Sequence, residues 1–146
     1  MKVLFIEPPK DIWFVMGEYL PPPYGIIQLA AFLERENKDV QLEIMDCNVE
    51  KVDWKQMETR IAASNPDVVA CASLATCNTY AVAKTLETAK RMAPKALTVT
   101  GGQHFTATAQ DNLQLYPEID VIIRNEGEQT LTELVKAHPQ TRLNVI

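Results

Sequence analysis

The chain has 146 residues, the length of one ordinary domain. Its composition, 47% hydrophobic and 23% charged, is close to globular averages, so a packed core needs no support from disulfides or metal ions. The net charge of −5 and the isoelectric point of about 5.0 argue against nucleic acid or an anionic membrane as partner, because both attract positive surfaces.

Targeting signals and cysteine chemistry are also weakly represented. No apolar run approaches the roughly 20 residues that cross a bilayer, and the apolar part of MKVLFIEPP is too short for a signal peptide. We therefore expect a cytoplasmic protein. The three cysteines, Cys47, Cys71 and Cys77, are odd in number and widely spaced, which predicts neither a disulfide framework nor a metal site.

The first predicted element is the β-rich apolar run of residues 2–6, which ends at Glu7-Pro8-Pro9. Residues 8–22 are rich in proline and aromatic side chains and are expected to form a long loop. Aromatic residues in and next to this loop can cover the end of a sheet; they are Trp13, Phe14, Tyr19 and Tyr24. Pro23 suits the first turn of a helix, and the apolar residues from Ile26 to Leu33 then recur at helical spacing.

Strands and helices continue to alternate along the rest of the chain. The next strand is expected at residues 40–46, and a modest helix over residues 54–63 stops at Asn65-Pro66. Residues 67–73 form a continuous apolar strand, as expected when both faces of a sheet are covered. Helix 76–92 should turn Val82, Leu86 and Ala89 inward and Lys84, Glu87, Lys90 and Arg91 outward. The remaining elements are strand 96–100, helix 104–115, strand 119–123, helix 128–137 and the start of another apolar run at 142–146.

Five strand–helix units in succession predict an α/β fold. We expect a doubly wound, mainly parallel, five-stranded Rossmann-like (flavodoxin-like) sheet with helices on both faces. Residues 1–146 are expected to be one domain of a longer protein.

Open parallel sheets bind ligands at the carboxyl ends of their strands, and the loops there lack several common ligand-binding motifs. The first loop begins Glu7-Pro8-Pro9 instead of GxGxxG, and proline has no N–H for a pyrophosphate. The chain also lacks a GxxxxGK[ST] loop, a hydroxyl-rich flavin phosphate loop and the acid cluster of a phospho-receiver. His104 and His138 are far apart and do not match HExxH.

Polar but largely uncharged residues remain at three strand ends, and these are the candidate binding residues: Ser73, Leu74, Thr76, Gly101, Gly102, Gln103, His104, Glu126, Gly127 and Glu128. Adjacent glycines let a large ligand lie against bare main chain. Hydroxyl and amide groups nearby can then bind its polar edges. The pattern favours a large ligand rich in amides and hydroxyls over a compact phosphate.

Purely structural interpretations of the same residues stay open. Gly101-Gly102 can be a tight strand-to-helix turn, and Ser73 and Thr76 can cap the next helix. The two carboxylates after the fifth strand fall in a first helical turn, where the helix macrodipole favours them without any ligand. His104 can be a polar helix-start residue without a chemical role.

Four segments in order resemble the N-terminal cobalamin-binding domain of cobalamin-dependent radical S-adenosylmethionine enzymes, over nearly the whole chain. The first is PPPYGIIQLAAFLERENKDVQLEIMD, with matching positions Pro22, Pro23, Gly25, Leu29, Ala30, Ala31, Leu33 and Asp46. The second is DVVACASLATCNTYAVAKTLETAKRMAP, a strand that ends in Ser73 with Thr76 soon after.

The third and fourth segments carry the shortest and most distinctive motifs. LTVTGGQHFTAT is similar to the family's GG-H-T segment, at Gly101, Gly102, His104 and Thr106. IDVIIRNEGEQTLTELV is similar to its GEGE segment, at Asp120, Val121, Arg124, Glu126, Gly127, Glu128, Thr130, Glu133 and Leu134. Two departures are Asn37-Lys38-Asp39 in place of a Gly-His turn and Asn125 in place of a glycine.

The resemblance implies a corrinoid over the carboxyl edge of the sheet, with its nucleotide tail near Ser73, Thr76, Gly101 and Gly102. Other cobalamin domains carry DxHxxG after the first strand, and its absence here implies cobalamin without a lower histidine ligand. The CxxxCxxC motif of the radical domain is also absent. The 4Fe–4S cluster and S-adenosylmethionine are therefore expected only in a downstream domain, the expected partner, and this chain alone is not expected to be catalytic.

Two alternatives to a cobalamin module remain at this stage. One is a small-molecule-binding or scaffold domain of the same fold that has lost cobalamin. The other is a stand-alone flavodoxin-like enzyme, which ranks lower because no acid–base or nucleophile constellation is present. Within the first interpretation, methyl transfer, cyclisation and rearrangement all stay open for the longer protein.

Overall fold

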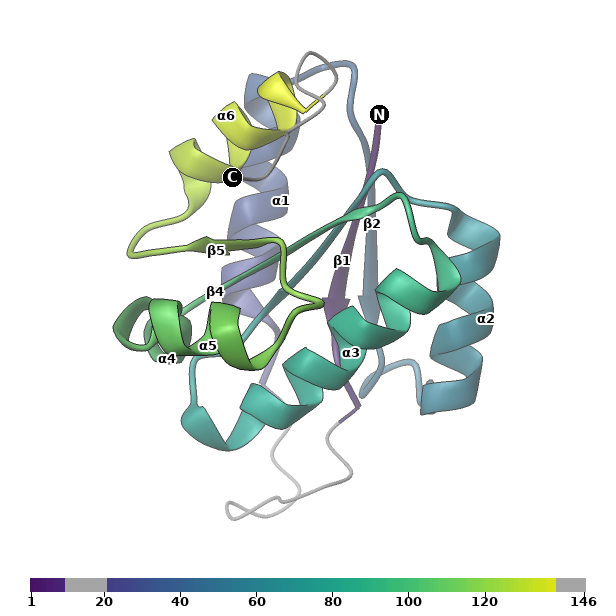
Figure 1. Cartoon of the computed structure of the whole chain (residues 1–146). Coiled ribbons are helices and arrows are strands. Elements are labelled where there is room, and N and C mark those ends of the chain that lie inside the picture. The colour runs from purple at the N-terminus through teal and green to yellow at the C-terminus, as the bar shows by residue number, and fades with distance from the viewer. Residues whose placement is uncertain (10–20, 139–146) are drawn as a thin grey trace.

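The computed structural model describes residues 1–9 and 21–138. In this part of the chain a single five-stranded sheet has the order β2-β1-β3-β4-β5, and every neighbouring pair is parallel (Figure 1). The strands are β1 (Lys2–Glu7), β2 (Gln41–Asp46), β3 (Val68–Ala72), β4 (Leu97–Gly101) and β5 (Val121–Ile123). The predicted parallel α/β sheet is confirmed.

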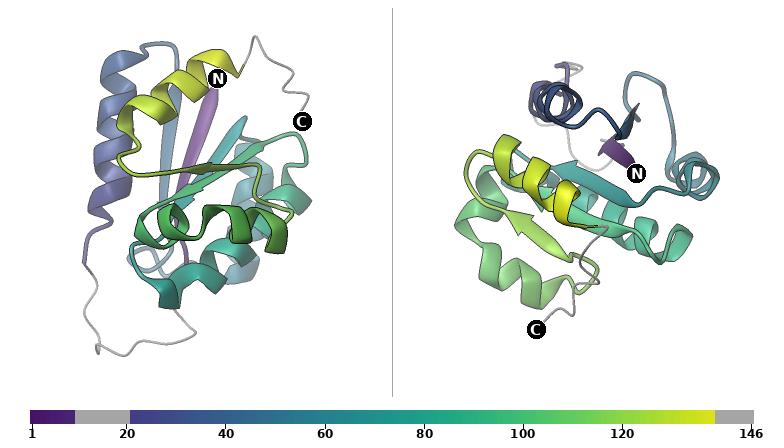
Figure 2. Two further views of the ribbon diagram at one scale, coloured as in Figure 1. Left: turned by 60° about the vertical axis from the view of Figure 1, so that its left-hand side comes forward. Right: turned by 90° about the horizontal axis from the view of Figure 1, so that it is seen from above.

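Helices cover both faces of the sheet, as a doubly wound fold requires (Figure 2). One face carries α1 (Tyr24–Glu36) and α6 (Glu128–Ala137), which pack against each other as well as against the strands. The opposite face carries α2 (Trp54–Ser64), α3 (Thr79–Met92), α4 (Gln103–Ala107) and α5 (Ala109–Leu115). The strand order reverses between β1 and β3, so the switch point of the sheet lies there.

Strand alternation divides the core into two apolar layers. In β1, Val3 and Phe5 face α1 and α6, whereas Leu4 and Ile6 face α2 and α3. All four side chains are at most 1% exposed, which explains why the central strands are continuous apolar runs in the sequence.

Three predicted elements differ from the structure. The expected helix 104–115 is two helices, α4 and α5, separated at Thr108. The hydroxyl of Thr108 donates to the His104 carbonyl at 2.7 Å, and the Asn112 side chain donates to the Thr108 carbonyl at 3.0 Å. Both carbonyls also accept main-chain N–H groups, at 3.1 and 3.0 Å, and the break lies at the backbone of Thr108, with φ −122° and ψ 27°. The expected helix 76–92 begins with a separate 3₁₀ turn, η1 (Thr76–Asn78), and β5 has three residues instead of five.

The side-chain predictions for α3 and for the first loop have mixed outcomes. Val82, Leu86 and Ala89 are fully buried, as predicted, but Lys90 is half-buried and pairs with Asp120 instead of pointing outward. Tyr24 begins α1 with 71% of its surface exposed, so it does not cover the sheet end. Trp13, Phe14, Tyr19 and residues 142–146 lie outside the described residues.

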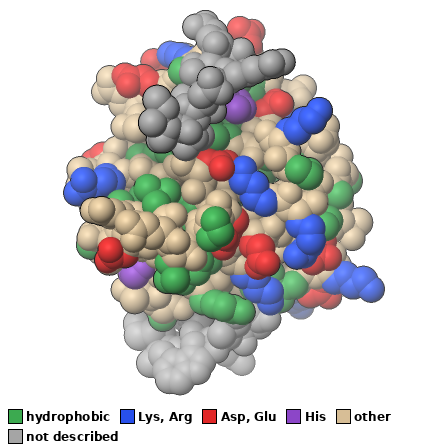
Figure 3. Space-filling view, viewed as in Figure 1, with side chains coloured by type: hydrophobic (Ala, Val, Ile, Leu, Met, Phe, Trp, Pro, Cys, Tyr) green, Lys and Arg blue, Asp and Glu red, His purple; other side chains and the backbone are tan. Residues whose placement is uncertain are grey.

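Charged groups are mixed on the molecular surface. On the face seen in Figure 3, Lys and Arg side chains alternate with Asp and Glu and form no single basic area. None of the helices in residues 1–9 and 21–138 combines the length and hydropathy that a bilayer crossing needs.

Candidate functional site

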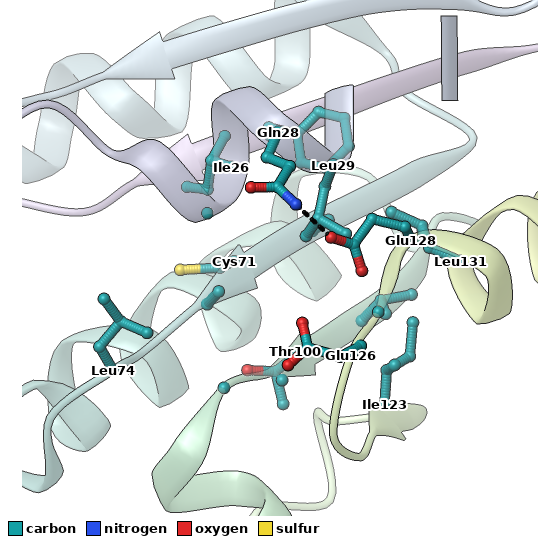
Figure 4. A pocket seen from close by; sticks show the side chains of 18 of the residues that line it. Ile26, Gln28, Leu29, Cys71, Leu74, Thr100, Ile123, Glu126, Glu128 and Leu131 are labelled. Atoms are coloured by element: carbon teal, nitrogen blue, oxygen red, sulfur yellow. Dashed lines mark hydrogen bonds between the residues drawn. The ribbon is translucent and has the colours of Figure 1, made fainter. Parts of the chain in front are cut away.

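A cavity of about 190 Å³ opens at the carboxyl edge of the sheet, on the face that α1 and α6 cover. Its floor is formed by the ends of β1, β3, β4 and β5, and its sides by the first turns of α1 and α6 (Figure 4). This is the edge where α/β sheets hold ligands, next to the switch point between β1 and β3.

The inner walls of the cavity are apolar. The side chains that form them belong to the core layer under α1 and α6: Phe5, Ile26, Leu29, Ala70, Val99, Ile123 and Leu131. Cys71 and Thr100 also border the cavity, although strand alternation directs their side chains to the α3 face, where Cys71 belongs to the other core layer. The interior therefore suits an apolar or aromatic group.

Polar side chains lie at the rim. Gln28 of α1 donates its amide to Glu128 of α6 at 2.5 Å, which links the two helices across the cavity (Figure 4). Asn125 and Glu126 complete the rim and are exposed. Among the described residues that line the cavity there are two carboxylates and no Lys, Arg or His. Such a rim accepts hydrogen bonds from amides or hydroxyls and repels anions.

The two adjacent glycines are required by packing. Gly102 has φ +99°, and a Cβ there would lie 2.1 Å from the Ser73 carbonyl oxygen. A Cβ on Gly101 would lie 2.9 Å from the Ile123 carbonyl oxygen. The tight-turn interpretation is therefore correct. Both glycines also border the cavity, which stays open beside them, so close packing and a ligand berth coexist.

Asn125 explains one departure from the family pattern. Its φ is +59°, in the left-handed region, and its main-chain N–H donates to the Thr106 hydroxyl at 2.9 Å. Asparagine is one of the few side chains that adopt this conformation readily, so it fits a position where the sequence resemblance predicts glycine. Gly127, two residues on, lets α6 approach Leu29, whose Cδ2 lies 3.2 Å from the Cβ position.

Six of the ten candidate residues line the cavity: Leu74, Gly101, Gly102, Glu126, Gly127 and Glu128. The other four do not line it: Ser73 directly follows β3, Thr76 begins η1, and Gln103 and His104 begin α4. Ser73 is buried and donates its hydroxyl to the Ala75 carbonyl at 2.6 Å. Neither Ser73 nor Thr76 is the N-cap of η1 or α3, so the capping interpretation is wrong.

His104 connects the two loops. Its Nδ1 lies 3.2 Å from the Thr76 hydroxyl, and its Nε2 lies 3.4 Å from the Asn112 side-chain nitrogen. Because an amide nitrogen only donates, this arrangement favours a proton on Nδ1, which donates to Thr76. The ring also packs edge-on against Phe105 at a centroid distance of 5.3 Å. Nδ1 is thus engaged within the chain, whereas Nε2 has only a long contact with an amide nitrogen that also donates to the Thr108 hydroxyl and carbonyl at 2.6 and 3.0 Å.

The contribution of α1 was missed by sequence reasoning about strand-end loops. Gly25, Ile26, Gln28 and Leu29 line the cavity, although they belong to the helix after the first loop. A signal for them existed in the PPPYG helix start, since the helix of a parallel βα unit begins at the carboxyl edge of the sheet.

Comparison with known proteins agrees with this geometry. The family model described as B12 binding domain matches residues 15–135. An anaerobic magnesium-protoporphyrin IX monomethyl ester cyclase of Rubrivivax gelatinosus is 33% identical over 144 residues, which are 97% of this chain and 25% of that protein. The uncharacterized methyltransferase PH0819 of Pyrococcus horikoshii is 34% identical over 141 residues, 94% of this chain and 29% of that protein. The chain thus spans about a quarter of the length of these relatives.

Two solved structures share the fold. The cobalamin-dependent S-adenosylmethionine radical enzyme OxsB, with aqua-cobalamin and S-adenosylmethionine bound, superposes with a TM-score of 0.77 at 17% identity and covers 97% of this chain and 19% of its own. The radical S-adenosylmethionine methyltransferase TsrM of Kitasatospora setae, with tryptophan and a S-adenosylmethionine analogue bound, gives 0.74 at 19% identity, over 98% and 26%. Because the family model matches most of this chain, the chain belongs to the B12-binding domain family.

Proposed function

We propose that the chain is the cobalamin-binding module of a radical S-adenosylmethionine enzyme of the methyltransferase or cyclase type. The observation that carries the proposal is the apolar cavity with a cation-free rim at the switch point of a B12-binding fold. The relatives named as a cyclase and a methyltransferase support the two reaction types, and a downstream domain of the same polypeptide would hold the 4Fe–4S cluster and S-adenosylmethionine.

The residues at this edge fit two parts of a cobalamin molecule, the lower base and the corrin ring. An apolar cavity of about 150 Å³ holds benzene, so a cavity of about 190 Å³ suits the aromatic lower base of the nucleotide tail. The corrin ring is far larger and belongs on the open edge outside. There Leu74, 72% exposed, and the main chain at Gly101-Gly102 offer an uncharged surface.

Polar groups around this surface match the substituents of a corrin. Its side chains are primary amides, which donate hydrogen bonds, and Glu126 and Glu128 present acceptors at the rim. The loop residues Ser73, Thr76, Gln103 and His104 are assigned to the nucleotide tail and the ring amides that pass over them. Gly127 keeps the first turn of α6 close enough to take part.

We assign the cobalt no histidine from this chain below the ring. The described residues that line the cavity include no histidine, and the Nδ1 of His104 lies 3.2 Å from the Thr76 hydroxyl. Bound cobalamin supplies a cobalt centre that can carry a methyl group or take part in radical chemistry. The residues of this chain bind the tail, orient the ring and exclude water from its lower face.

A gel-filtration experiment tests the proposal. The purified chain is mixed with hydroxocobalamin, free ligand is removed, and corrin absorbance is measured in the protein fraction. Wild-type protein should retain the corrin. Ala72→Phe, which places a ring in the cavity, should lose most of it, whereas Ala62→Phe on the exposed surface of α2 should not. Absence of corrin from wild-type protein would favour the alternative, a domain of this fold without cobalamin.

The cobalt ligand has its own measurement. The electron paramagnetic resonance spectrum of the reduced, cobalamin-bound protein should lack nitrogen superhyperfine splitting. Splitting by one nitrogen would show a lower ligand and contradict this part of the proposal.

A further inference from the structure

We propose that the cavity between α1 and α6 selects corrinoids by their lower base, accepting benzimidazole and phenol types and discriminating against purines. This inference rests on the proposed function, because it assumes that a corrinoid tail enters the cavity. It goes further by naming the chemical class of tail that the walls accept.

The first step concerns the side chains that a buried base would touch. Ile26 and Leu131 come from the two helices and Val99 from the sheet, and they are at most 3% exposed. Their side chains are hydrocarbon and offer no hydrogen-bond donor or acceptor. A polar atom on the inner edge of a base therefore gains no side-chain partner to replace the water that it loses.

The second step concerns the main chain of the floor. Ala70 pairs with β1 on one side and β4 on the other, and Val99 pairs with β3 and β5. Peptide groups in the middle of such a sheet are engaged in the parallel ladder and are not free for a ligand. At Ala70 and Val99 the floor is thus as poor in free hydrogen-bonding groups as the walls.

The third step concerns the rim, where the polar side chains gather. Gln28, Asn125, Glu126 and Glu128 lie at the mouth, and the amide of Gln28 is already donated to Glu128. A base linked to the ribose at the mouth turns its far edge inward, away from these groups. An adenine carries ring nitrogens and an amine on that edge, a benzimidazole carries carbon, and a phenol carries no ring nitrogen at all.

A buried polar group without a partner weakens binding by about tenfold or more. We therefore expect an adenine-type cobamide to bind at least about tenfold more weakly than cobalamin. The cobalt–base bond lowers the affinity of cobalamin relative to the adenine type, because benzimidazole binds cobalt more strongly than adenine and more free energy is needed to detach it. A phenol-type cobamide is free of this effect, because its base does not coordinate cobalt.

The test measures the affinity of the purified chain for four corrinoids: cobalamin, an adenine-type cobamide, a phenol-type cobamide and cobinamide, which lacks the tail. Absorbance titration gives each Kd without any enzymatic turnover. The expected order of affinity is phenol type at or above cobalamin, then the adenine type, with cobinamide weaker than cobalamin.

A wall variant assigns the selectivity to this cavity. Leu29→Gln places an amide at a half-buried wall position and should bring the Kd values of cobalamin and the adenine type closer together. Leu115→Gln makes the same change on α5, where the side chain is 67% exposed, and should leave their ratio unchanged. Thermal unfolding of both variants separates a change of wall chemistry from a loss of fold.

The outcomes separate the two proposals. If no corrinoid binds, the proposed function fails and this inference fails with it. If cobalamin binds but the adenine type binds equally well, only the selectivity is overturned. Equal binding of cobinamide and cobalamin would overturn it too, because the tail would then contribute nothing.

Discussion

Replacing Gly102 by alanine tests the turn that joins β4 to α4. The backbone there has φ +99° and ψ 177°, a region that side chains with a Cβ rarely adopt. The added methyl group would also lie 2.1 Å from the Ser73 carbonyl oxygen, a main-chain atom of the residue that directly follows β3. The substitution therefore strains the backbone and forces two strand ends apart.

The expected loss of stability has two parts. Holding a residue with a Cβ in this conformation costs about 1–3 kcal/mol, and relieving the overlap costs about 1–3 kcal/mol more. The sum, roughly 2–6 kcal/mol, is a large share of the 5–15 kcal/mol by which domains are typically stable. Gly102→Ala should thus be strongly destabilised or unfolded at room temperature.

Urea unfolding followed by far-ultraviolet circular dichroism measures this effect. Gly25→Ala is a matched control, since a Cβ at that position in α1 meets nothing within 4 Å and its φ is ordinary. The control should be unchanged or more stable by up to about 1 kcal/mol, because alanine is the better helix former. A loss below about 0.5 kcal/mol in Gly102→Ala would refute the reasoning, since that is the range of neutral surface substitutions.

Two further predictions concern ionisable groups. Burial raises the pKa of Glu43, but hydrogen bonds from Lys2 and Ser64 outweigh it and hold the pKa below its ordinary value. The ionised Glu43 carboxylate therefore stabilises the fold at pH values above the ordinary pKa of glutamate, and this stabilisation is lost as the pH falls through the lowered pKa of the folded protein. Glu43→Gln should thus reduce the free energy of unfolding by about 0.5 kcal/mol at pH 7 and by progressively less in acid. Burial also raises the pKa of the Cys47 thiol to about 12, so a thiol reagent at pH 8 should label exposed Cys77 and leave Cys47 unlabelled until the protein unfolds.

Each of these has a clear contrary result. A Glu43→Gln variant whose stability deficit in urea is as large at pH 3 as at pH 7 would exclude the ionised carboxylate as its cause. Labelling of Cys47 in folded protein at the rate of Cys77, seen by mass spectrometry of peptides, would show that its burial is not maintained. Cys77→Ser provides the control for the second measurement, because it should remove the fast phase of labelling.

The sheet was predictable because its strands carry a strong local signal. Val3 to Ile6 and Val68 to Cys71 are apolar on every residue, since both faces of the central strands are covered. The break between α4 and α5 was not predictable in the same way. The spacing of residues 104–115 predicts one helix and gives no sign that Thr108 leaves helical backbone angles, at φ −122° and ψ 27°.

The residues of the candidate site that directly follow strands could be predicted from the sequence, whereas those that α1 contributes could not. Gly101 and Gly102 are visible in the sequence because two glycines end a strand. Leu29 and Gln28 look like ordinary positions of an amphipathic helix, one inward and one outward. Only the packing of α1 beside α6 shows that the first turn of α1 overhangs the strand ends and closes the cavity.

The Gln28–Glu128 hydrogen bond joins two groups that stand 100 residues apart in the chain. The ribosome makes the polypeptide from the N-terminus, so α1 is synthesised long before α6. Until α6 is made, the apolar residues of α1 that share its core layer cannot pack against it. The cavity between α1 and α6 is thus among the last features of this domain to be completed. Under the proposed function, a corrinoid tail enters this cavity only after residue 131 has been translated, because Leu131 forms part of its wall.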